Sequence, residues 1–595
     1  MTGSGLTSRA VRAGLIGGVA LVYLALIGMI QKFDSRNLIG DFLTLGNLLM
    51  ALPPLLTGFL AIRPRLVGGQ REAAGPRPAL TAGLVSGAVV GGVSAAGVAL
   101  VEILPEGAVR RIFIQVSPEL LSILTFGRGV PLGLVLLVVY GAVLGLLGAG
   151  FRLLPDRYRR PLGVGLATTL TFALLQRIFP PLLFELGLDT RWLYSPTLLG
   201  LTVPGALLVF AVSAGLAALW GARGPVVRQR VRQLPPERRK LLNGTSLLVL
   251  AVVLAVLPQL IGSTLSQVLG TVGVYLLMGL GLNIVVGYAG LLDLGYVAFF
   301  ATGAYMTALF TGANRVTSIG DLVAPAFALH LNFYLAVPFV IIVTAVVGLL
   351  IGAPVLRLRG DYLAIVTLGF GEIAKVAVQS SWLQEFTGGP QGLRDVTDAA
   401  IGGIGFRDPQ PFFYLVLVFC ALAIFVSQRL AGSRVGRAWN AMREDELAAE
   451  AMGVSTIRFK LLAFAMGAAV GSLSGTLFAV QIGSITPESF TIIVSITALA
   501  VVILGGMGSI PGVVVGSMLL IGLPGLLDEF EEYRLLVYGA ALILVMVLRP
   551  QGLVPNVRRS RELQEDEAAQ DQWLKQEEEE EAPAVTVGGG GGGAS

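Results

Sequence analysis

Charged side chains are scarce in this 595-residue chain: they make up 13% of it, whereas apolar side chains make up 54%. A soluble protein carries roughly 25% charged residues, so most of this chain lacks the charge that a water-exposed surface requires. Its one cysteine, Cys420, excludes an internal disulfide, and its one histidine, His330, has no His or Cys nearby to complete a metal site. The composition therefore excludes a secreted disulfide scaffold, a disordered protein and a nucleic-acid-binding domain, and it favours a multi-span membrane protein.

Motifs for catalysis are missing as well. The sequence has no Gly-x4-Gly-Lys-Ser/Thr loop for ATP, no HExxH or CxxC pattern, and too few histidines to support a Ser-His-Asp triad. We therefore expect no enzyme activity, and we expect this chain to bind no metal and no cofactor.

Apolar stretches long enough to cross a bilayer, about 20 residues each, recur along the whole chain. They predict an all-α, polytopic helical membrane protein with about sixteen transmembrane helices, six in the first part and ten in the second. The predicted spans are 12–30, 38–62, 79–103, 129–154, 161–186, 198–222, 241–261, 264–286, 289–312, 331–358, 362–379, 411–430, 458–481, 489–505, 508–527 and 533–549.

Basic residues gather in the loops that follow the second, fourth and sixth predicted spans, at 63–77, 157–160 and 223–240. Cytoplasmic loops carry an excess of Lys and Arg, so this alternation predicts that both termini are cytoplasmic. The loop 104–128 also holds three arginines although we place it outside, and we expect it to contain a short interfacial helix.

Charge and proline content divide the chain into four parts. Residues 1–222 form an N-terminal membrane extension of about six helices, and residues 223–240, basic and with three prolines, form a cytoplasmic linker. Residues 241–555 form a second helical domain. Residues 556–595 are an acidic, Gly-rich tail with too few apolar residues to fold, and we expect this tail to be disordered.

Ionisable residues inside predicted spans are candidates for a polar substrate path, because a charge in lipid costs free energy. Asp293 lies in a Gly-rich stretch of the span 289–312, and Glu372 and Lys375 share one face of the span 362–379 at i, i+3 spacing. These groups either line a path for a solute or serve the structure, as an ion pair or a helix cap.

A polar segment, residues 436–453, interrupts the apolar pattern of the second part. Its alanines and methionines, from Ala438 to Met452, recur at helical spacing, and Gly453 fits the position that ends a helix. The pattern predicts a short amphipathic helix at the cytoplasmic surface between two spans. Such a helix can take up force from a partner that hydrolyses ATP, or it can rest on lipid.

Six ordered motifs lie within residues 241–555. They occupy residues 281–305, 356–372, 387–393, 443–464, 503–512 and 549–555. With these motifs, the segment resembles the permease subunit of high-affinity branched-chain amino acid ABC transporters, the LivM type. Residues 1–240 and the acidic tail lie outside the resemblance, and Leu447 stands where the general ABC-permease docking motif has Glu.

The resemblance implies the permease subunit of an ATP-driven importer for branched-chain or related amino acids, in the inner membrane of a bacterium or archaeon. Its partners would be a second, LivH-like permease, two ATP-binding cassette subunits that use the ATP, and an extracytoplasmic solute-binding protein, with membrane lipid around them. The residues expected to line the substrate path are Asn283, Gly287, Asp293, Gly295, Thr367 and Glu372. The residues expected to dock the ATPase are Arg437, Arg443, Glu444, Asp445, Ala448, Ala449, Gly453 and Lys460.

Three alternatives stay open. Related permeases carry urea or short amides, so the motifs do not fix the solute. A secondary carrier that uses Asp293 or Glu372 to couple to an ion gradient would need no ATPase, although the docking-like segment argues against it. A membrane scaffold without transport activity would bind neither a solute nor an ATPase.

Overall fold

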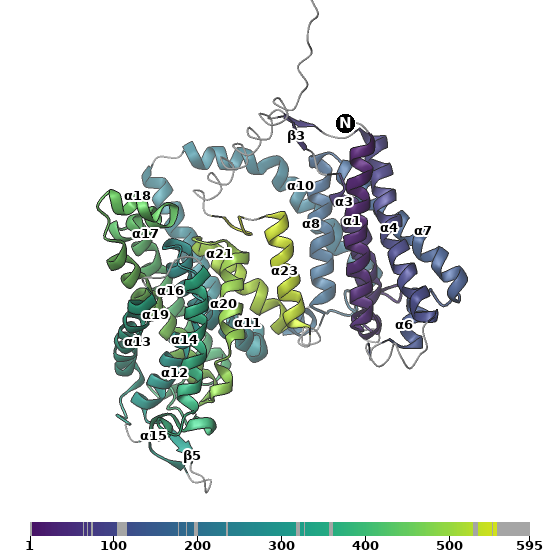
Figure 1. The fold of residues 1–595 in the computed structure, drawn as a ribbon. Coiled ribbons are helices and arrows are strands. Elements are labelled where there is room, and N and C mark those ends of the chain that lie inside the picture. Colours follow the sequence, from purple (N-terminus) through teal and green to yellow (C-terminus); the bar gives the residue numbers. More distant parts are fainter. Residues whose placement is uncertain are drawn as a thin grey trace, which may run out of the picture. The chain divides into compact units, whose positions relative to one another are not determined.

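The computed structural model (Figure 1) describes residues 3–555 with several gaps. Outside the description lie residues 1–2, 63–64, 68–69, 73–74, 104–112, 114–115, 177, 186, 188, 196–199, 234–235, 317–321, 326–327, 356–360, 527–532, 550 and 556–595. The predicted tail and part of the predicted loop 104–128 therefore fall outside it. The chain divides into two compact units, residues 1–250 and 251–595.

Membrane-length helices dominate the fold, as the all-α prediction requires. Among the described residues, ten helices are long and apolar enough to cross a membrane, and three shorter apolar helices accompany them. The expected count of about sixteen is therefore not confirmed. The predicted span 241–261 and most of the span 264–286 belong to one helix, α11 (Pro236–Leu282), which is interrupted at Gly262 with φ 74°. Three further predicted spans, 38–62, 289–312 and 508–527, contain the shorter apolar helices Leu45–Ala61, Val297–Thr311 and Ile510–Leu526.

Unit 1 is a helical bundle with two short hairpins. Its core is formed where α1, α3, α4 and α7 pack on one another. Its helices are α1 (Gly3–Leu26), α2 (Met29–Asp34), α3 (Leu45–Leu60), α4 (Pro76–Ile103), α6 (Pro118–Leu124), α7 (Val130–Leu153), α8 (Asp156–Leu174), α9 (Phe179–Glu185) and α10 (Val203–Gln233). Its hairpins pair β1 (Asn37–Ile39) with β2 (Leu43–Thr44), and β3 (Arg65–Val67) with β4 (Gln70–Glu72).

Glycines bring α4 and α7 into close contact. A Cβ added at Gly87 would overlap the carbonyl oxygen of Gly141, and one added at Gly141 would overlap the carbonyl oxygen of Gly87. Membrane helices associate through such close packing, because lipid gives them no hydrophobic driving force toward each other. The short helix α6 lies within the loop where an interfacial helix was expected, and the residues predicted as a linker are largely helical, in α10 and α11.

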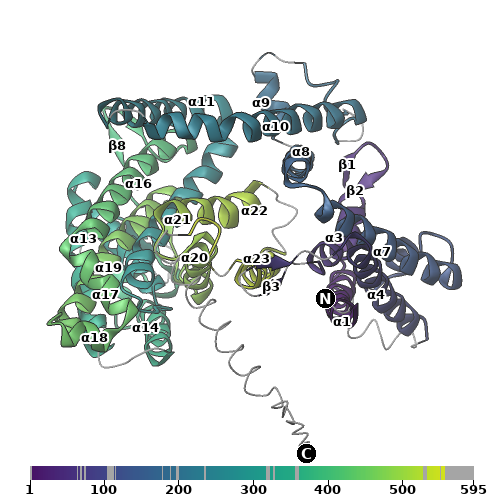
Figure 2. The same ribbon diagram turned by 90° about the horizontal axis from the view of Figure 1, so that it is seen from above.

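Unit 2 contains the rest of α11 and every later helix. These are η1 (Asn283–Tyr288), α12 (Val297–Thr311), α13 (Phe333–Val355), α14 (Asp361–Gln379), α15 (Gln384–Thr387), η2 (Gly389–Gln391), α16 (Pro409–Gly432), α17 (Arg434–Glu444), α18 (Glu446–Ala451), α19 (Thr456–Ile482), η3 (Pro487–Ser489), α20 (Ile492–Gly505), α21 (Ile510–Ser517), η4 (Met518–Gly522), α22 (Leu523–Leu526) and α23 (Arg534–Leu548). Helices α20 and α21 lie side by side, and α20 also contacts α23 (Figures 1 and 2).

Helix α19 is the central element of unit 2. It packs against α12 and α13, and 72% of its apolar stretch is buried inside the protein, more than in any other described span. Its 27 residues cover about 40 Å at 1.5 Å per residue. It therefore joins the two ends of the unit.

The two ends of unit 2 differ in structure (Figure 1). Helices α17 and α18 form one end. The other end carries an antiparallel four-stranded sheet in the order β10 (Ser484–Ile485), β7 (Leu393–Arg394), β5 (Asn314–Val316), β6 (Leu322–Val323). A separate hairpin pairs β8 (Ala400–Ile401) with β9 (Ile404–Gly405). We call these two ends the α17–α18 end and the sheet end.

Candidate functional site

The segment predicted as one amphipathic helix forms two, α17 and α18, with a break at Asp445. The Asp445 carboxylate accepts hydrogen bonds from the backbone N–H groups of Leu447 at 2.9 Å and Ala448 at 3.0 Å, and so caps the start of α18. Gly453 has φ 86° and follows the end of α18, where a left-handed residue closes the last turn. Asp445, which we expected to dock an ATPase, therefore also stabilises the start of α18.

One face of α17 and α18 is anchored to the core of unit 2. Trp439 is fully buried, and its indole Nε1 donates to the backbone oxygen of Phe459 at 2.8 Å. Ala449 is buried as well. Lys460, also expected at the docking surface, is only 6% exposed and forms an ion pair of 2.6 Å with Glu446. This pair joins α18 to α19.

The opposite face presents apolar side chains. Leu447 is 63% exposed and Met452 is 85% exposed. Ala448 and Gly453, from the expected docking set, are exposed beside them. Exposed apolar side chains close together in the chain are candidates for contact with another protein. Arg437 and Glu444 are exposed on α17.

Arg443 links α17 to the membrane helices. Its guanidinium Nη1 donates to the backbone oxygen of Gly287 in η1 at 2.6 Å. Its side chain also lies over Gly290, where φ is 73° and an added Cβ would come within 2.8 Å of Arg443 Cγ. Arg443 therefore contacts unit 2 itself, and it connects α17 to the π-helical segment η1.

A hydrogen bond connects the η1 segment to the loop that precedes α21. The Asn283 side chain is 1% exposed, and its Oδ1 accepts from the backbone N–H of Gly508 at 2.8 Å. A Cβ added at Gly287 would overlap the same Oδ1 atom. We call Arg443, Gly287, Asn283 and Gly508 the inner latch, because they form one chain of contacts from α17 to α21. Single π-helical turns occur frequently at functional sites.

The residues around Asp293 form a second close-packed group. Asp293 is 2% exposed, and its carboxylate accepts from the backbone N–H of Gly295 at 2.9 Å. Thr367 Oγ1 accepts from the backbone N–H of Leu294 at 3.0 Å, and a Cβ added at Gly295 would overlap the Thr367 carbonyl oxygen. These residues hold the loop before α12 against α14, and the cavities described below are lined by other residues.

Glu372 differs from the other expected path residues, because it is exposed. Within the described part of the chain, no ion pair joins it to Lys375. Gln379 lies seven residues further along α14, on the same helical face, and its Nε2 donates to Glu488 Oε1 at 3.3 Å. The face of α14 that carries Glu372 therefore leads to Glu488, near the sheet end.

Two cavities of about 490 and 440 Å³ lie near Glu488. Both are lined by Thr271, Tyr275, Ser489 and Val494, so they adjoin each other. We call the two together the sheet-end chamber. Sequence reasoning missed these residues, because they come from α11, η3 and α20, which only the fold brings together.

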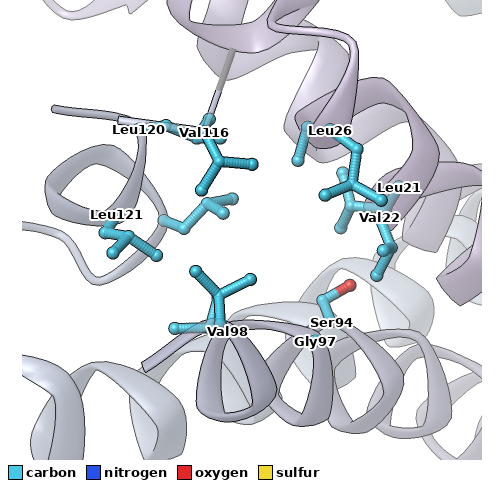
Figure 3. Close-up of a pocket in the computed structure, with 12 residues that line it drawn as sticks. Leu21, Val22, Leu26, Ser94, Gly97, Val98, Val116, Leu120 and Leu121 are labelled. Carbon is cyan, nitrogen blue, oxygen red and sulfur yellow. The ribbon is translucent and has the colours of Figure 1, made fainter. Parts of the chain in front are cut away.

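A third cavity lies in unit 1 between α1, α4 and α6 (Figure 3). It measures about 40 Å³ and is lined by apolar side chains such as Leu21, Val98 and Leu120. The hydroxyl of Ser94 donates to the backbone oxygen of Val90 at 2.9 Å. A site this small has room for only a few waters, so it does not suit an organic solute.

Comparison with known proteins places these features in a family. Residues 264–546 match the family described as branched-chain amino acid transport system / permease component. Over 322 residues the chain is 41% identical to the high-affinity branched-chain amino acid transport system permease protein LivM of Salmonella typhimurium, covering 50% of this chain and 72% of that protein. The chain belongs to this permease family.

Other relatives agree with the assignment. LivM of Escherichia coli is also 41% identical over 322 residues, covering 50% of this chain and 72% of LivM. The permease protein LivH of Escherichia coli is 26% identical over 297 residues, covering 47% of this chain and 91% of LivH. No solved structure matches the chain. The predicted resemblance is confirmed, the protein is a multi-pass transport permease, and the inner latch and the chamber lie in the matched region.

Proposed function

We propose that this chain is the permease subunit of an ATP-driven importer for branched-chain or related amino acids. A second, LivH-like permease, two ATP-binding cassette subunits and an extracytoplasmic solute-binding protein would complete the assembly. The family membership supports this proposal, because the similar LivM and LivH proteins are permease proteins of a high-affinity branched-chain amino acid transport system.

One observation carries the proposal: α17 presents Arg443 to η1 while the neighbouring α18 presents Leu447 outward. A partner bound at Leu447 and Met452 can therefore move helices whose other contacts reach into the membrane core. We place this end in the cytoplasm, where ATPase subunits would bind it. Nucleotide-driven movement would then open and close the inner latch as a two-state rearrangement.

The exposed face of α14 supports a second permease as partner. Glu372 lies near the middle of this span, and Ile365, Ile373 and Val376 are exposed along the same helix. A carboxylate facing lipid costs free energy, and such groups almost always face a helix bundle or a water-filled path. We propose that the LivH-like permease covers this face.

The arrangement fits alternating access, in which a transporter opens to one side of the membrane at a time. The chamber lies toward the sheet end, whereas the inner latch is formed toward the α17–α18 end. We propose that solute enters from the sheet end and leaves after the latch separates.

The test is leucine uptake into proteoliposomes that hold the complete assembly and internal ATP. We expect the double variant Leu447→Glu, Met452→Glu to lose the ATPase subunits on purification and to lose uptake at least about tenfold, because two charges would be buried at the interface. Ile401→Glu is the matched control, because Ile401 is also exposed and apolar but lies in the β8–β9 hairpin.

Two results would contradict the proposal. In the first, the double variant keeps its ATPase subunits and transports leucine like the unchanged protein. In the second, this chain alone supports uptake that an ionophore abolishes, as an ion-coupled carrier requires.

A further inference from the structure

The sheet-end chamber has a polar side near η3. Glu488, which lines it, is held by the hydrogen bond from Gln379, and Gln481 Nε2 donates to Thr271 Oγ1 at 3.0 Å. The hydroxyl group of Ser489 lies beside Glu488 in the chain. Of the described residues that line the two cavities, Glu488 is the only charged one. A solute in the chamber would therefore meet one carboxylate among uncharged hydrogen-bonding groups.

The chamber also has an apolar side. Phe300 and Phe478 line the smaller cavity, and their ring centroids are 5.1 Å apart. Phe490 packs on both rings, at 5.5 Å from Phe300 and 6.1 Å from Phe478. Val494 lines both cavities from the first turn of α20. This side offers an aromatic and aliphatic surface to an apolar group.

The size of the chamber suits a small organic solute. Sites for small molecules measure roughly 300–1,000 Å³ and combine apolar walls with a few placed polar groups. Both cavities fall in this range, at about 490 and 440 Å³. A carboxylate next to an apolar wall is complementary to a molecule that carries an ammonium group and an apolar side chain. Urea and simple amides have neither a positive charge nor such a side chain.

We propose that the sheet-end chamber binds the transported solute within the membrane, and that Glu488 accepts the α-ammonium group of an amino acid whose apolar side chain contacts Val494 and Phe478. This inference rests on the proposed function and names the groups that select the solute. Glu488 thereby favours amino acids over neutral amides. The hydroxyl group of Thr491 lines the same cavity as Glu488 and can donate to the solute carboxylate, and the hydroxyl group of Ser489, which forms a hydrogen bond of 3.2 Å with Thr486 Oγ1, lines it as well.

The experiment compares Glu488→Gln with Glu488→Asp in the complete assembly, by leucine uptake into proteoliposomes. Glu488→Gln keeps the shape and removes the charge, so we expect uptake at low leucine concentration to fall about tenfold or more, the loss expected for one charge-assisted hydrogen bond. Glu488→Asp keeps the charge and is expected to retain most of the uptake. Glu385→Gln is the matched control, because Glu385 is exposed in α15 and lies outside the chamber.

A second variant tests the apolar side independently of charge. Val494→Phe would fill part of the chamber, so we expect leucine uptake to fall more than alanine uptake. If leucine uptake is unchanged in both Glu488→Gln and Val494→Phe, the chamber does not bind the solute. An equal loss in Glu488→Gln and Glu488→Asp would also overturn the assignment, because it would show a structural role.

The same assay separates the two proposals. If the unchanged assembly shows no ATP-dependent leucine uptake, the proposed function fails. If it transports leucine and the chamber variants do so equally well, the proposed function stands and only the chamber assignment fails.

Discussion

Both units are rich in glycine, but the glycines have different surroundings. In unit 1, Gly87 and Gly141 let two regular helices touch through their backbones. In unit 2, Gly287 and Gly508 lie where η1 meets a turn, and the Asn283 side chain fills the space between them. Close packing alone is therefore a poor sign of a transport element. The better sign is close packing combined with a buried polar side chain and an irregular helix.

The most deeply buried spans belong to unit 2, although the least buried span, Leu248–Tyr288 at 6%, lies mostly in this unit as well. No described span of unit 1 has more than 39% of its apolar stretch buried, whereas the spans formed by α19 and by η3 with α20 reach 72% and 50%. The cavity in unit 1 is small and apolar, whereas the chamber in unit 2 is large and partly polar. The family match, residues 264–546, also lies within unit 2.

The largest effect is expected from a pair of substitutions, one in each unit, that tests the contrast between the glycines of the two units. Gly287→Val would force the new side chain into Asn283 and break the inner latch, so we expect leucine uptake to fall about 100-fold, as overpacking by up to ~3 kcal/mol allows. Gly87→Val would disturb the α4–α7 contact, so we expect lower thermal stability. Uptake by assembled Gly87→Val transporters should stay within about threefold of the unchanged protein.

The readout is uptake divided by the amount of assembled complex, measured beside a melting curve. Normal uptake by the Gly287→Val variant would show that the close packing at the inner latch is not needed for transport. Complete loss of uptake by well-assembled Gly87→Val transporters would show that unit 1 takes part in transport.

A smaller effect is expected from the ion pair that joins α18 to α19. Glu446→Gln would leave the Lys460 ammonium, 6% exposed, without its carboxylate, and we expect a loss of about 3 kcal/mol of stability. Glu450→Gln removes an exposed acid from the same helix, and should change stability by less than about 0.5 kcal/mol. Thermal unfolding of the purified complex measures the stability of both variants. Equal melting temperatures for Glu446→Gln and Glu450→Gln would show that the Lys460–Glu446 ion pair does not contribute to stability.

Much of the site's local structure could be predicted from the sequence. Helical spacing of alanine and methionine located α17 and α18, and Gly453 located their end. The face that turns outward could not be predicted, because apolar side chains occur on both faces. Trp439 lies in the hydrophobic core and donates a hydrogen bond to Phe459 in α19, whereas Met452 is 85% exposed in the described chain.

Residue roles were harder to predict than elements. Asp445 and Lys460 matched a docking motif, yet one caps α18 and the other pairs with Glu446, so their part in docking stays a prediction. Asp293 was expected to line a path; its Oδ1 accepts from the N–H of Gly295, and its part in a path stays a prediction. Glu488 lies between two predicted spans, where an acid is usually a solvated loop residue, and only the fold places it at a cavity.

The central claim is that movement of α17 reaches the membrane helices through Arg443. Its most direct test measures ATP hydrolysis and leucine uptake together in the complete assembly carrying Arg443→Gln, with Arg434→Gln as the control, because Arg434 is exposed on α17 and lies outside the expected docking set. We predict that Arg443→Gln keeps its ATPase subunits and hydrolyses ATP while uptake falls about tenfold or more, and that Arg434→Gln keeps both activities. Uptake that stays proportional to ATP hydrolysis in the Arg443→Gln assembly would contradict the claim.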